Sequence, residues 1–242
     1  MPAERFFLKE PFTKGAKTSL LEQEFHHLHH VMRIKKGELV ELINGEGQIA
    51  HAELVSLDKH SASLLLTEVI TTAPEPFSLI LAQAMPRLAK LELIVEKAVE
   101  LSVTELWLFP GKMSERDIFS PSQKKRLEQI LISALKQCGR TYLPKFHFLP
   151  PLGPAWKKIP GHLLFGDTSP DAPPLFTLLQ AQKTQEREFV IFIGPEKGFH
   201  PSETEFLKNV LGCMGVKLHT NILRVETAAI TSLSLLSNYV SF

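Results

Sequence analysis

Two loops in the last quarter of the chain carry the residue types that a small-ligand site needs. The first, 194–199, reads Gly-Pro-Glu-Lys-Gly-Phe and follows an apolar run at 189–193; the second, 218–224, follows a short strand pattern at 216–218. The two runs predict buried strands, and a helix pattern follows each loop. Because α/β proteins bind ligands at the carboxyl ends of their strands, the two loops favour an enzyme with a pocket between them.

The candidate ligand-binding residues come from both loops and from the helix after the second. Glycine lets the backbone approach a ligand closely, and apolar side chains can form the walls. The simpler interpretation of the first loop is a tight turn after a strand. It does not explain why a second loop of the same kind follows another strand about thirty residues later. Thr227 and Ala228 are small, as a helix packed on a ligand requires, although core packing would explain them equally well. The candidates are Ile193, Gly194, Pro195, Gly198, Leu218, Ile222, Leu223, Thr227 and Ala228.

Three charged residues in or beside these loops are candidates for catalysis: Glu196, Arg224 and Glu226. A carboxylate can accept a proton, and a fixed cation can stabilise developing negative charge. The alternative for Arg224 and Glu226 is that they pair with each other or cap the last helix. The sequence has no Cys/His cluster with zinc spacing and no Gly-x-Ser-x-Gly motif, so we predict neither a zinc site nor a serine nucleophile.

The composition, with 44% hydrophobic and 22% charged among 242 residues, is that of an ordinary globular protein. No segment approaches the roughly 18 unbroken apolar residues of a membrane span, and the first nine residues lack a signal-peptide pattern. Cys138 and Cys213 are isolated, in segments that we interpret as helical, and unpaired thiols fit a reducing compartment. We therefore expect a cytoplasmic protein without a membrane partner.

Positive charge is concentrated between 112 and 145, with eight Lys/Arg against three acidic residues, although the net charge is only +1. A basic run is more often a solvated helix face than a binding surface. If it bound phosphates, binding would weaken steeply with salt.

Residues 1–73 predict a small β-rich domain. Asn44-Gly45 lies between strand patterns at 39–43 and 48–55 and predicts a hairpin, and residues 61–69 form a further strand pattern. Several short strands in so few residues favour a barrel. Prolines at 74 and 76 indicate a linker, because proline cannot continue a strand ladder.

From residue 77 onward, strand and helix patterns alternate. Strands are predicted at 78–82, 105–109, 162–165 and 189–193, and helices at 90–101, 122–138, 201–211 and 225–240. This order predicts an α/β fold with a mostly parallel sheet covered on both faces.

The two loops also carry a resemblance. Gly-Pro-Glu-x-Gly-Phe followed by Ile-Leu-Arg-x-Glu-Thr-Ala resembles the RsmE family. Segment 26–33 is similar to the family's His-Leu-x-x-Val-Leu-Arg pattern, 96–103 to its Lys-Ala-x-Glu-Leu-Gly-Val helix end, and 137–140 to its Glu-Gln-x-x-Arg segment. Matches in order along nearly the whole chain are more specific than any single motif.

The resemblance implies a fold and a reaction. RsmE proteins join a C-terminal trefoil-knotted SPOUT methyltransferase domain, here 74–242, to a small N-terminal PUA-like β-barrel that helps to hold RNA, here 1–73. They transfer a methyl group from S-adenosyl-L-methionine to N3 of a uridine in 16S ribosomal RNA of the small ribosomal subunit, as homodimers and without a metal. Arg224 would then stabilise the N3 anion, and Glu196 or Glu226 would accept the proton.

For RNA contact, the residue types and the resemblance indicate cations and one aromatic ring. The candidates are Arg5, Phe6, Arg33, Arg87, Arg116, Lys124, Lys125, Arg126 and Arg140. The histidines of 26–30 would share helix faces at metal-ligand spacing, but the sequence fixes no acidic third ligand.

Three positions depart from the family pattern: Lys197 and Ser102 replace glycines, and His200 replaces a helix-capping serine. A non-glycine residue with positive φ costs on the order of 1 kcal/mol, and an imidazole is a weak cap. Two other functions stay open. One is a knotted methyltransferase with another target, such as a ribose 2′-hydroxyl; the other is a non-catalytic ribosome-assembly factor, which only Lys197 favours.

Overall fold

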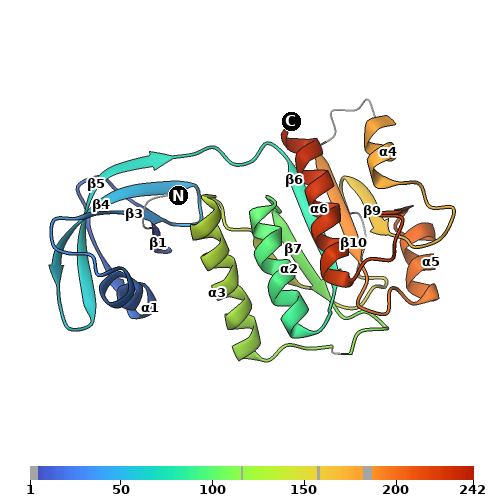
Figure 1. Cartoon of the computed structure of the whole chain (residues 1–242), viewed down its shortest axis with the longest axis horizontal. Helices are drawn as coiled ribbons and strands as arrows, with labels where there is room; N and C mark the ends of the chain where they lie inside the picture. The colour runs from blue at the N-terminus through green and yellow to red at the C-terminus, as the bar shows by residue number, and fades with distance from the viewer. Residues whose placement is uncertain (1–4, 116, 157–158, 182–186) are drawn as a thin grey trace. The chain divides into compact units, whose positions relative to one another are not determined.

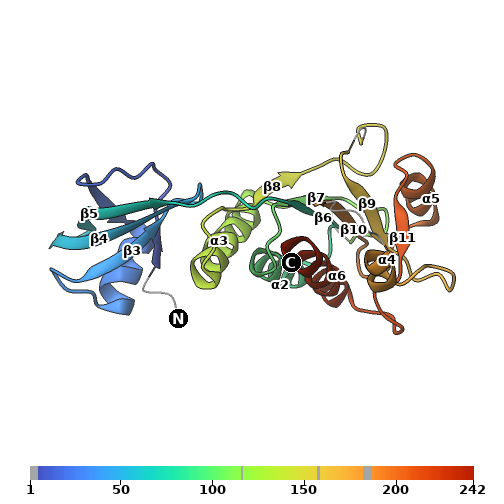
Figure 2. The ribbon, with the colours of Figure 1, turned by 90° about the horizontal axis from the view of Figure 1, so that it is seen from above.

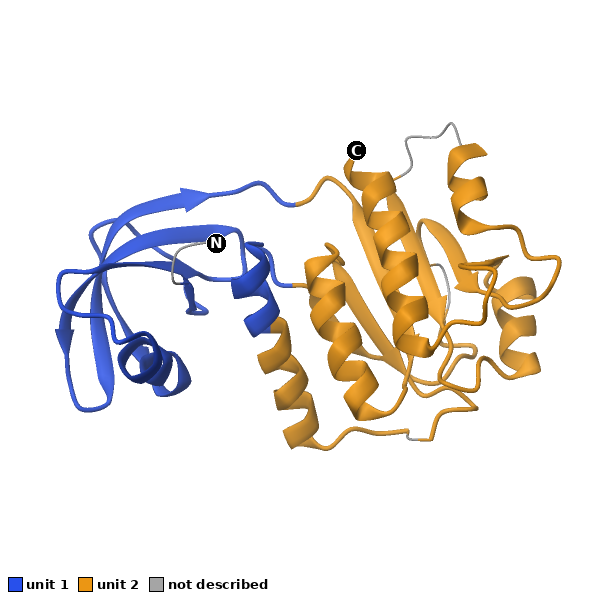
Figure 3. Ribbon diagram, viewed as in Figure 1, with its two compact units in different colours: residues 1–74, 132–143 blue, residues 75–131, 144–242 orange. Residues whose placement is uncertain are grey.

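The computed structural model describes residues 5–115, 117–156, 159–181 and 187–242. The chain forms two compact units, 1–74 with 132–143 and 75–131 with 144–242 (Figure 3). The end of helix α3 (Pro121–Cys138) therefore groups with the N-terminal strands, which the sequence pattern did not predict. Local contacts explain this grouping: Lys136 pairs with Glu24 at 2.7 Å, and the Tyr142 hydroxyl donates to the Thr72 carbonyl at 2.9 Å.

The N-terminal unit is built on a five-stranded mixed sheet that curls into a half-barrel (Figure 1). Its strands are β1 (Arg5–Phe7), β2 (Lys17–Leu21), β3 (Leu39–Ile43), β4 (Gln48–Leu57) and β5 (Ser61–Thr71), in the order β1-β3-β4-β5-β2. The predicted hairpin is confirmed: the side-chain oxygen of Asn44 accepts hydrogen bonds from the N–H groups of Glu46 and Gln48. A short helix, α1 (Glu22–His26), continues into a π-helix, η1 (His27–Met32).

The second unit is an α/β fold with an all-parallel, six-stranded sheet, as predicted. Its strands are β6 (Ser78–Ala84), β7 (Glu105–Phe109), β8 (Lys145–Phe148), β9 (His162–Gly166), β10 (Glu188–Ile193) and β11 (Met214–Val216), in the order β11-β9-β10-β6-β7-β8. Its other helices are α2 (Leu88–Glu100), α4 (Leu175–Ala181), α5 (Pro201–Asn209) and α6 (Val225–Ser241).

Helices cover both faces of this sheet, with α2 and α6 on one face and α5 on the other (Figures 1 and 2). Successive side chains of β10 point to opposite faces of the sheet, so they pack against the helices on both faces. The ring of Phe189 packs against Tyr239 of α6, whereas Phe192 contacts Trp156 in the core that also contains Leu207 of α5. This two-sided burial explains why the central strands read as continuous apolar runs.

Two predicted placements are wrong. The short strand expected at 216–218 is β11 at Met214–Val216, so Leu218 lies in the loop that follows it. Cys213 lies between α5 and β11 rather than in a helix, because α5 ends at Asn209. Its thiol is buried, which raises its pKa to about 12. Separately, none of the helices in the described part of the chain is both long and apolar enough to cross a bilayer.

Candidate active site

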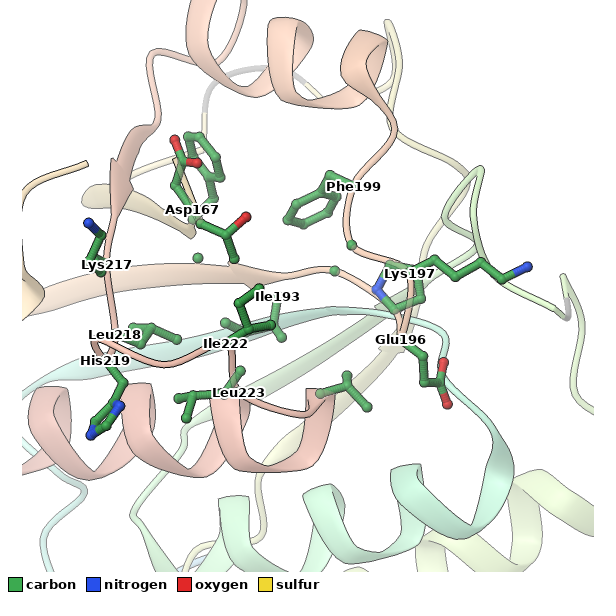
Figure 4. Close-up of a pocket in the computed structure, with 18 of the residues that line it drawn as sticks. Asp167, Ile193, Glu196, Lys197, Phe199, Lys217, Leu218, His219, Ile222 and Leu223 are labelled. Carbon is green, nitrogen blue, oxygen red and sulfur yellow. The ribbon is translucent and has the colours of Figure 1, made fainter. Parts of the chain in front are cut away.

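A pocket of about 490 Å³ lies at the carboxyl ends of β9, β10 and β11, where three loops meet the start of α6 (Figure 4). This volume lies within the range of small-molecule sites, roughly 300–1,000 Å³. The loops contribute Phe165–Thr168, Ile193–Phe199 and Lys217–Leu223, and α6 contributes Val225 and Ala228. The loops converge because they follow strands of one parallel sheet.

The loop after β10 folds back on itself at two glycines. Gly194 leaves little room for a side chain, since an added Cβ would lie 3.0 Å from backbone atoms of Gly198 and Phe199. Gly198 has a φ of 75°, and its N–H donates to the Pro195 carbonyl at 2.9 Å. The two glycines let peptide groups, rather than side chains, border the pocket.

Lys197 is among the residues that line the pocket, but its side chain is exposed and extends away from the pocket (Figure 4). The positive φ belongs to Gly198 and not to Lys197, so the backbone strain considered for this lysine does not arise. The departure from the family's glycine therefore leaves both the loop and the pocket intact.

The loop after β9 brings in Asp167, which the sequence analysis missed. Its Oδ1 accepts from the Ser169 N–H at 2.9 Å, and its Oδ2 lies 3.1 Å from Lys208 Nζ. Burial raises the pKa of Asp167, but Ser169 and Lys208 outweigh it and hold the pKa below its usual value. Gly215 makes the space, because an added Cβ would lie 2.5 Å from Oδ2.

At the start of α6, Glu226 is buried and forms an ion pair with Lys90 of α2. Burial raises the pKa of Glu226, but hydrogen bonds from Lys90 and the helix backbone, with the nearby charge of Arg224, bring it below its usual value. The second oxygen, Oε2, is buried without a hydrogen-bond partner among the described residues. Arg224 is exposed at the N-cap of α6, and neither it nor Glu226 lines the pocket.

Glu196 does line the pocket and is held at one oxygen. Its Oε1 accepts from the backbone N–H of Arg87, the N-cap of α2, at 3.0 Å. The Arg87 guanidinium in turn binds both oxygens of Glu115 at 2.7 and 2.9 Å.

The helix that follows the Gly-Pro-Glu loop, α5, is fully capped by His200. Its Nδ1 accepts from the Ser202 N–H at 3.2 Å, and Glu203 accepts from the His200 N–H at 2.9 Å. The other oxygen of Glu203, which is buried, accepts from the Lys112 N–H at 2.9 Å. The imidazole thus replaces the expected serine in a reciprocal capping box.

The structure brings most of the predicted ligand-binding residues together. Eight of the nine line the pocket, and the exception is Thr227, which is exposed on α6. The sequence analysis also missed several further lining residues besides those of the β9 loop: Lys197, Phe199, Thr204, Lys217, Val225 and residues 219–221. Because β9 itself was predicted, the strand-end rule applied to Gly166-Asp167-Thr168 would have found the missing loop.

The predicted RNA contacts on β1 need correction. Phe6 is fully buried in the core of the N-terminal unit, so it cannot stack on a base. It turns inward because β1 pairs with β3, which sets Phe6 beside Leu42. The side chain of Arg5 is only 9% exposed and pairs with Glu41.

Two of the other cations predicted to contact RNA already have acidic partners: Arg87 pairs with Glu115, and Arg126 with Glu92. Exposed pairs of this kind contribute little stability. Lys124 Nζ lies 4.4 Å from the ring centroid of Phe148. Arg33 and Lys125 are exposed, Arg140 is half-buried, and Arg116 lies outside the described residues.

The imidazoles of His26, His29 and His30 gather on α1 and η1, with ring centroids 4.6 and 5.0 Å apart for two of the pairs. No three His, Cys, Asp or Glu residues in the described ranges are arranged to hold a metal ion.

Comparison with known proteins places this fold and pocket in a family. A family model for an RNA methyltransferase domain matches residues 73–237, and one for an RNA methyltransferase PUA domain matches 20–67. The ribosomal RNA small subunit methyltransferase E of Synechocystis is 30% identical over 90% of this chain and 72% of its own length. The chain belongs to the ribosomal RNA small subunit methyltransferase E (RsmE) family.

Two solved structures share the fold over 98% of both chains. The RsmE of Neisseria gonorrhoeae, bound to S-adenosyl methionine, is 28% identical with a TM-score of 0.82. A methyltransferase from Legionella pneumophila in complex with the same cofactor is 26% identical with a TM-score of 0.88. The family resemblance read from the sequence is thereby confirmed.

Proposed function

We propose that this RsmE-family chain transfers a methyl group from S-adenosyl-L-methionine (SAM) to N3 of a uridine in 16S ribosomal RNA of the small subunit. The observation that carries the proposal is the pocket, because it is lined by Gly-Pro-Glu and Ile-Leu residues of the two motifs that resemble the family. Two relatives with this fold bind SAM in their structures, and the named relatives act on small-subunit ribosomal RNA.

The residues that line the pocket fit this cofactor. Leu218, Leu223 and Val225 offer apolar surface for a flat base. The tight approach at Gly194 exposes peptide groups that can bond the edge of that base. The charged carboxylate of Asp167 is an acceptor for hydroxyl or ammonium donors.

Bound SAM supplies a methyl group on a positively charged sulfur. Uridine N3 carries a proton and becomes nucleophilic when that proton leaves, which spreads negative charge over O2 and O4. We assign Arg224 to stabilise this charge and Glu196, at the pocket, to accept the proton. Glu226 does not line the pocket, and its carboxylate pairs with Lys90, so we assign it to anchor the start of α6 beside Arg224.

We also propose that residues 74–242 form a trefoil-knotted SPOUT domain and that 1–73 form a PUA-like RNA-binding domain. The chain path supports the knot: β11 is the edge strand, yet the next helix, α6, packs against β10 and β6 in the middle of the sheet. The segment between them, 217–223, passes along the pocket.

A homodimer is the oligomeric state that we propose, in the cytoplasm where ribosomes are assembled. The resemblance to the RsmE family supports it, and the apolar side chain of Ile222 at the pocket, which is 86% exposed, is compatible with it. Sedimentation equilibrium of the free protein tests this, and a monomer at micromolar concentration would contradict it.

The reaction is tested with labelled SAM, small ribosomal subunits that lack the modification, and free 16S ribosomal RNA. We expect methyl transfer to the subunits and weaker transfer to free RNA, because a chain with a net charge of +1 has little general affinity for RNA. If no methyl group were transferred to the subunits and none to the free RNA, the proposal would be overturned.

A further inference from the structure

Gln83, near the end of β6, is a fully buried polar residue whose side chain is directed at the neighbouring strand end. Its Nε2 donates to the carbonyl oxygens of Ile193 and Gly194, both at 3.2 Å, and of Ala84 at 2.8 Å. Gln83 does not line the pocket, but Ile193 and Gly194 do. Gln83 therefore reaches a bound ligand only through these two residues.

The orientation of this amide follows from its surroundings. Nε2 has two protons to share among three carbonyl oxygens, whereas the reversed amide would set its own oxygen against the same three acceptors. The other end of the amide, Oε1, is buried and has no partner among the described residues. All the bonding that the structure gives this side chain is thus donation to backbone carbonyls.

These bonds occur where the β ladder stops. Gln83 is the register partner of Ile193, and the chain then turns at Gly194 into Pro195, which has no N–H to continue the ladder. The carbonyls of Ile193, which is buried, and of Gly194, which is partly buried, need hydrogen-bond donors once the ladder has ended, and Gln83 supplies them. The direction in which the loop leaves the sheet therefore depends on a side chain from β6.

We propose that Gln83 is a positioning residue for cofactor binding: its amide N–H groups hold the Ile193 and Gly194 carbonyls so that the loop 194–198 keeps its ligand-binding shape. The inference rests on the proposed function, since it concerns the same pocket. It assigns Gln83 no contact with the cofactor or with RNA.

The most specific test is Gln83→Glu, because the change is nearly isosteric and adds a titratable group. A carboxylate cannot donate to the three carbonyls and is repelled by them, and burial beside acceptors raises its pKa. The protonated acid can again donate one hydrogen bond. Cofactor binding by this variant is therefore expected to depend on pH where binding by the wild type does not.

Isothermal calorimetry with S-adenosylhomocysteine, the chemically stable product of the cofactor, measures this. At about pH 8.5 we expect Gln83→Glu to bind at least about tenfold more weakly than the wild type, and at about pH 6 to recover to within about threefold. The wild type is expected to change by less than about threefold over that range. Gln83→Met, which removes the donors at similar length, is expected to bind about tenfold more weakly at both pH values.

Thr104→Val is the matched control. The Thr104 hydroxyl bonds the N–H and carbonyl of Leu79, both at 3.0 Å, at the opposite end of the same strand. This variant is expected to lower the melting temperature and leave the dissociation constant unchanged. If Gln83→Glu showed no extra pH dependence, or if Thr104→Val weakened binding as much as Gln83→Met, Gln83 would be structural only. A wild type that bound no cofactor would instead overturn the proposed function as well.

Discussion

Lys90 on α2 forms an ion pair with the buried carboxylate of Glu226, which lies 136 residues later at the start of α6. The contact links two helices that cover the same face of the sheet (Figure 2). It also places a fixed negative charge two residues from Arg224. The segment assigned to catalysis is thus anchored by a residue from the first helix of the α/β unit.

Removing Lys90 should destabilise the fold, because it leaves a buried carboxylate without its partner. For Lys90→Met we expect the free energy of unfolding to fall by about 1–3 kcal/mol at neutral pH, measured by urea denaturation. The double variant Lys90→Met/Glu226→Gln should recover much of this loss, since no unpaired charge remains. Equal stability of Lys90→Met and the wild type would show that the pair contributes nothing.

The same pair predicts a dependence of stability on pH. The pKa of Glu226 lies below its ordinary value of 4.5, so its contribution is present above about pH 4.5 and is lost as the pH falls through the folded-state pKa. We expect wild-type stability to fall more steeply than that of Glu226→Gln between about pH 5 and about pH 3. Parallel curves for the two proteins would rule out this contribution.

Arg224 is predicted to act on the transition state. Because its side chain is exposed and does not line the pocket, Arg224→Gln should leave cofactor affinity and stability near wild-type values. We expect kcat to fall by roughly 10²–10³-fold, measured by methyl transfer to small subunits. Arg187→Gln, an exposed arginine that precedes β10 at the other end of the strand, is the control. If kcat fell equally in Arg224→Gln and Arg187→Gln, the loss would come from the removal of any positive charge and not from the position of Arg224.

Replacement of Gly194 is predicted to weaken cofactor binding. The Cβ of Gly194→Ala would lie 3.0 Å from backbone atoms that cannot move independently, so we expect cofactor affinity to fall by about tenfold or more. Gly212→Ala is the control, because Gly212 has a φ of 71° with open space around it and does not line the pocket. Gly212→Ala should lose about 1 kcal/mol of stability and keep its affinity for the cofactor. A similar loss of cofactor affinity in Gly194→Ala and Gly212→Ala would contradict the prediction.

Ser102 is one of the described non-glycine residues with positive φ, at 61°, and it stands where the family has glycine. Ser102→Gly should therefore stabilise the protein, by about 0.5–1 kcal/mol after the greater freedom of glycine in the unfolded chain is subtracted. Ser102→Ala keeps the Cβ and should give no gain. Thermal unfolding of the three proteins decides, and a stabilised alanine variant would contradict the strain argument.

Local patterns predicted most of the elements, because hydrophobic periodicity depends on near neighbours, but they missed short ones such as β1, β2, β8 and α4. Strand 105–109 and the hairpin at 44–47 are observed where the sequence placed them. Two of the three pocket loops, 194–199 and 218–224, were predicted because the carboxyl ends of parallel strands share an edge, whereas the loop after β9 was missed.

What the sequence could not show depends on pairing between distant segments. Phe6 looked available for stacking until β1 paired with β3 and turned it inward. The partners Lys90 and Glu226 lie far apart in the chain, as do Gln83 and Gly194. No spacing rule predicts such contacts, because strand order and helix packing create them.

The most direct test of the central claim is mass analysis of nucleosides from small ribosomal subunits after incubation with the wild-type protein and labelled SAM. We expect labelled 3-methyluridine at a single site with the wild type, and almost none with Arg224→Gln. Label in a ribose-methylated nucleoside, or no labelled nucleoside at all, would contradict the central claim.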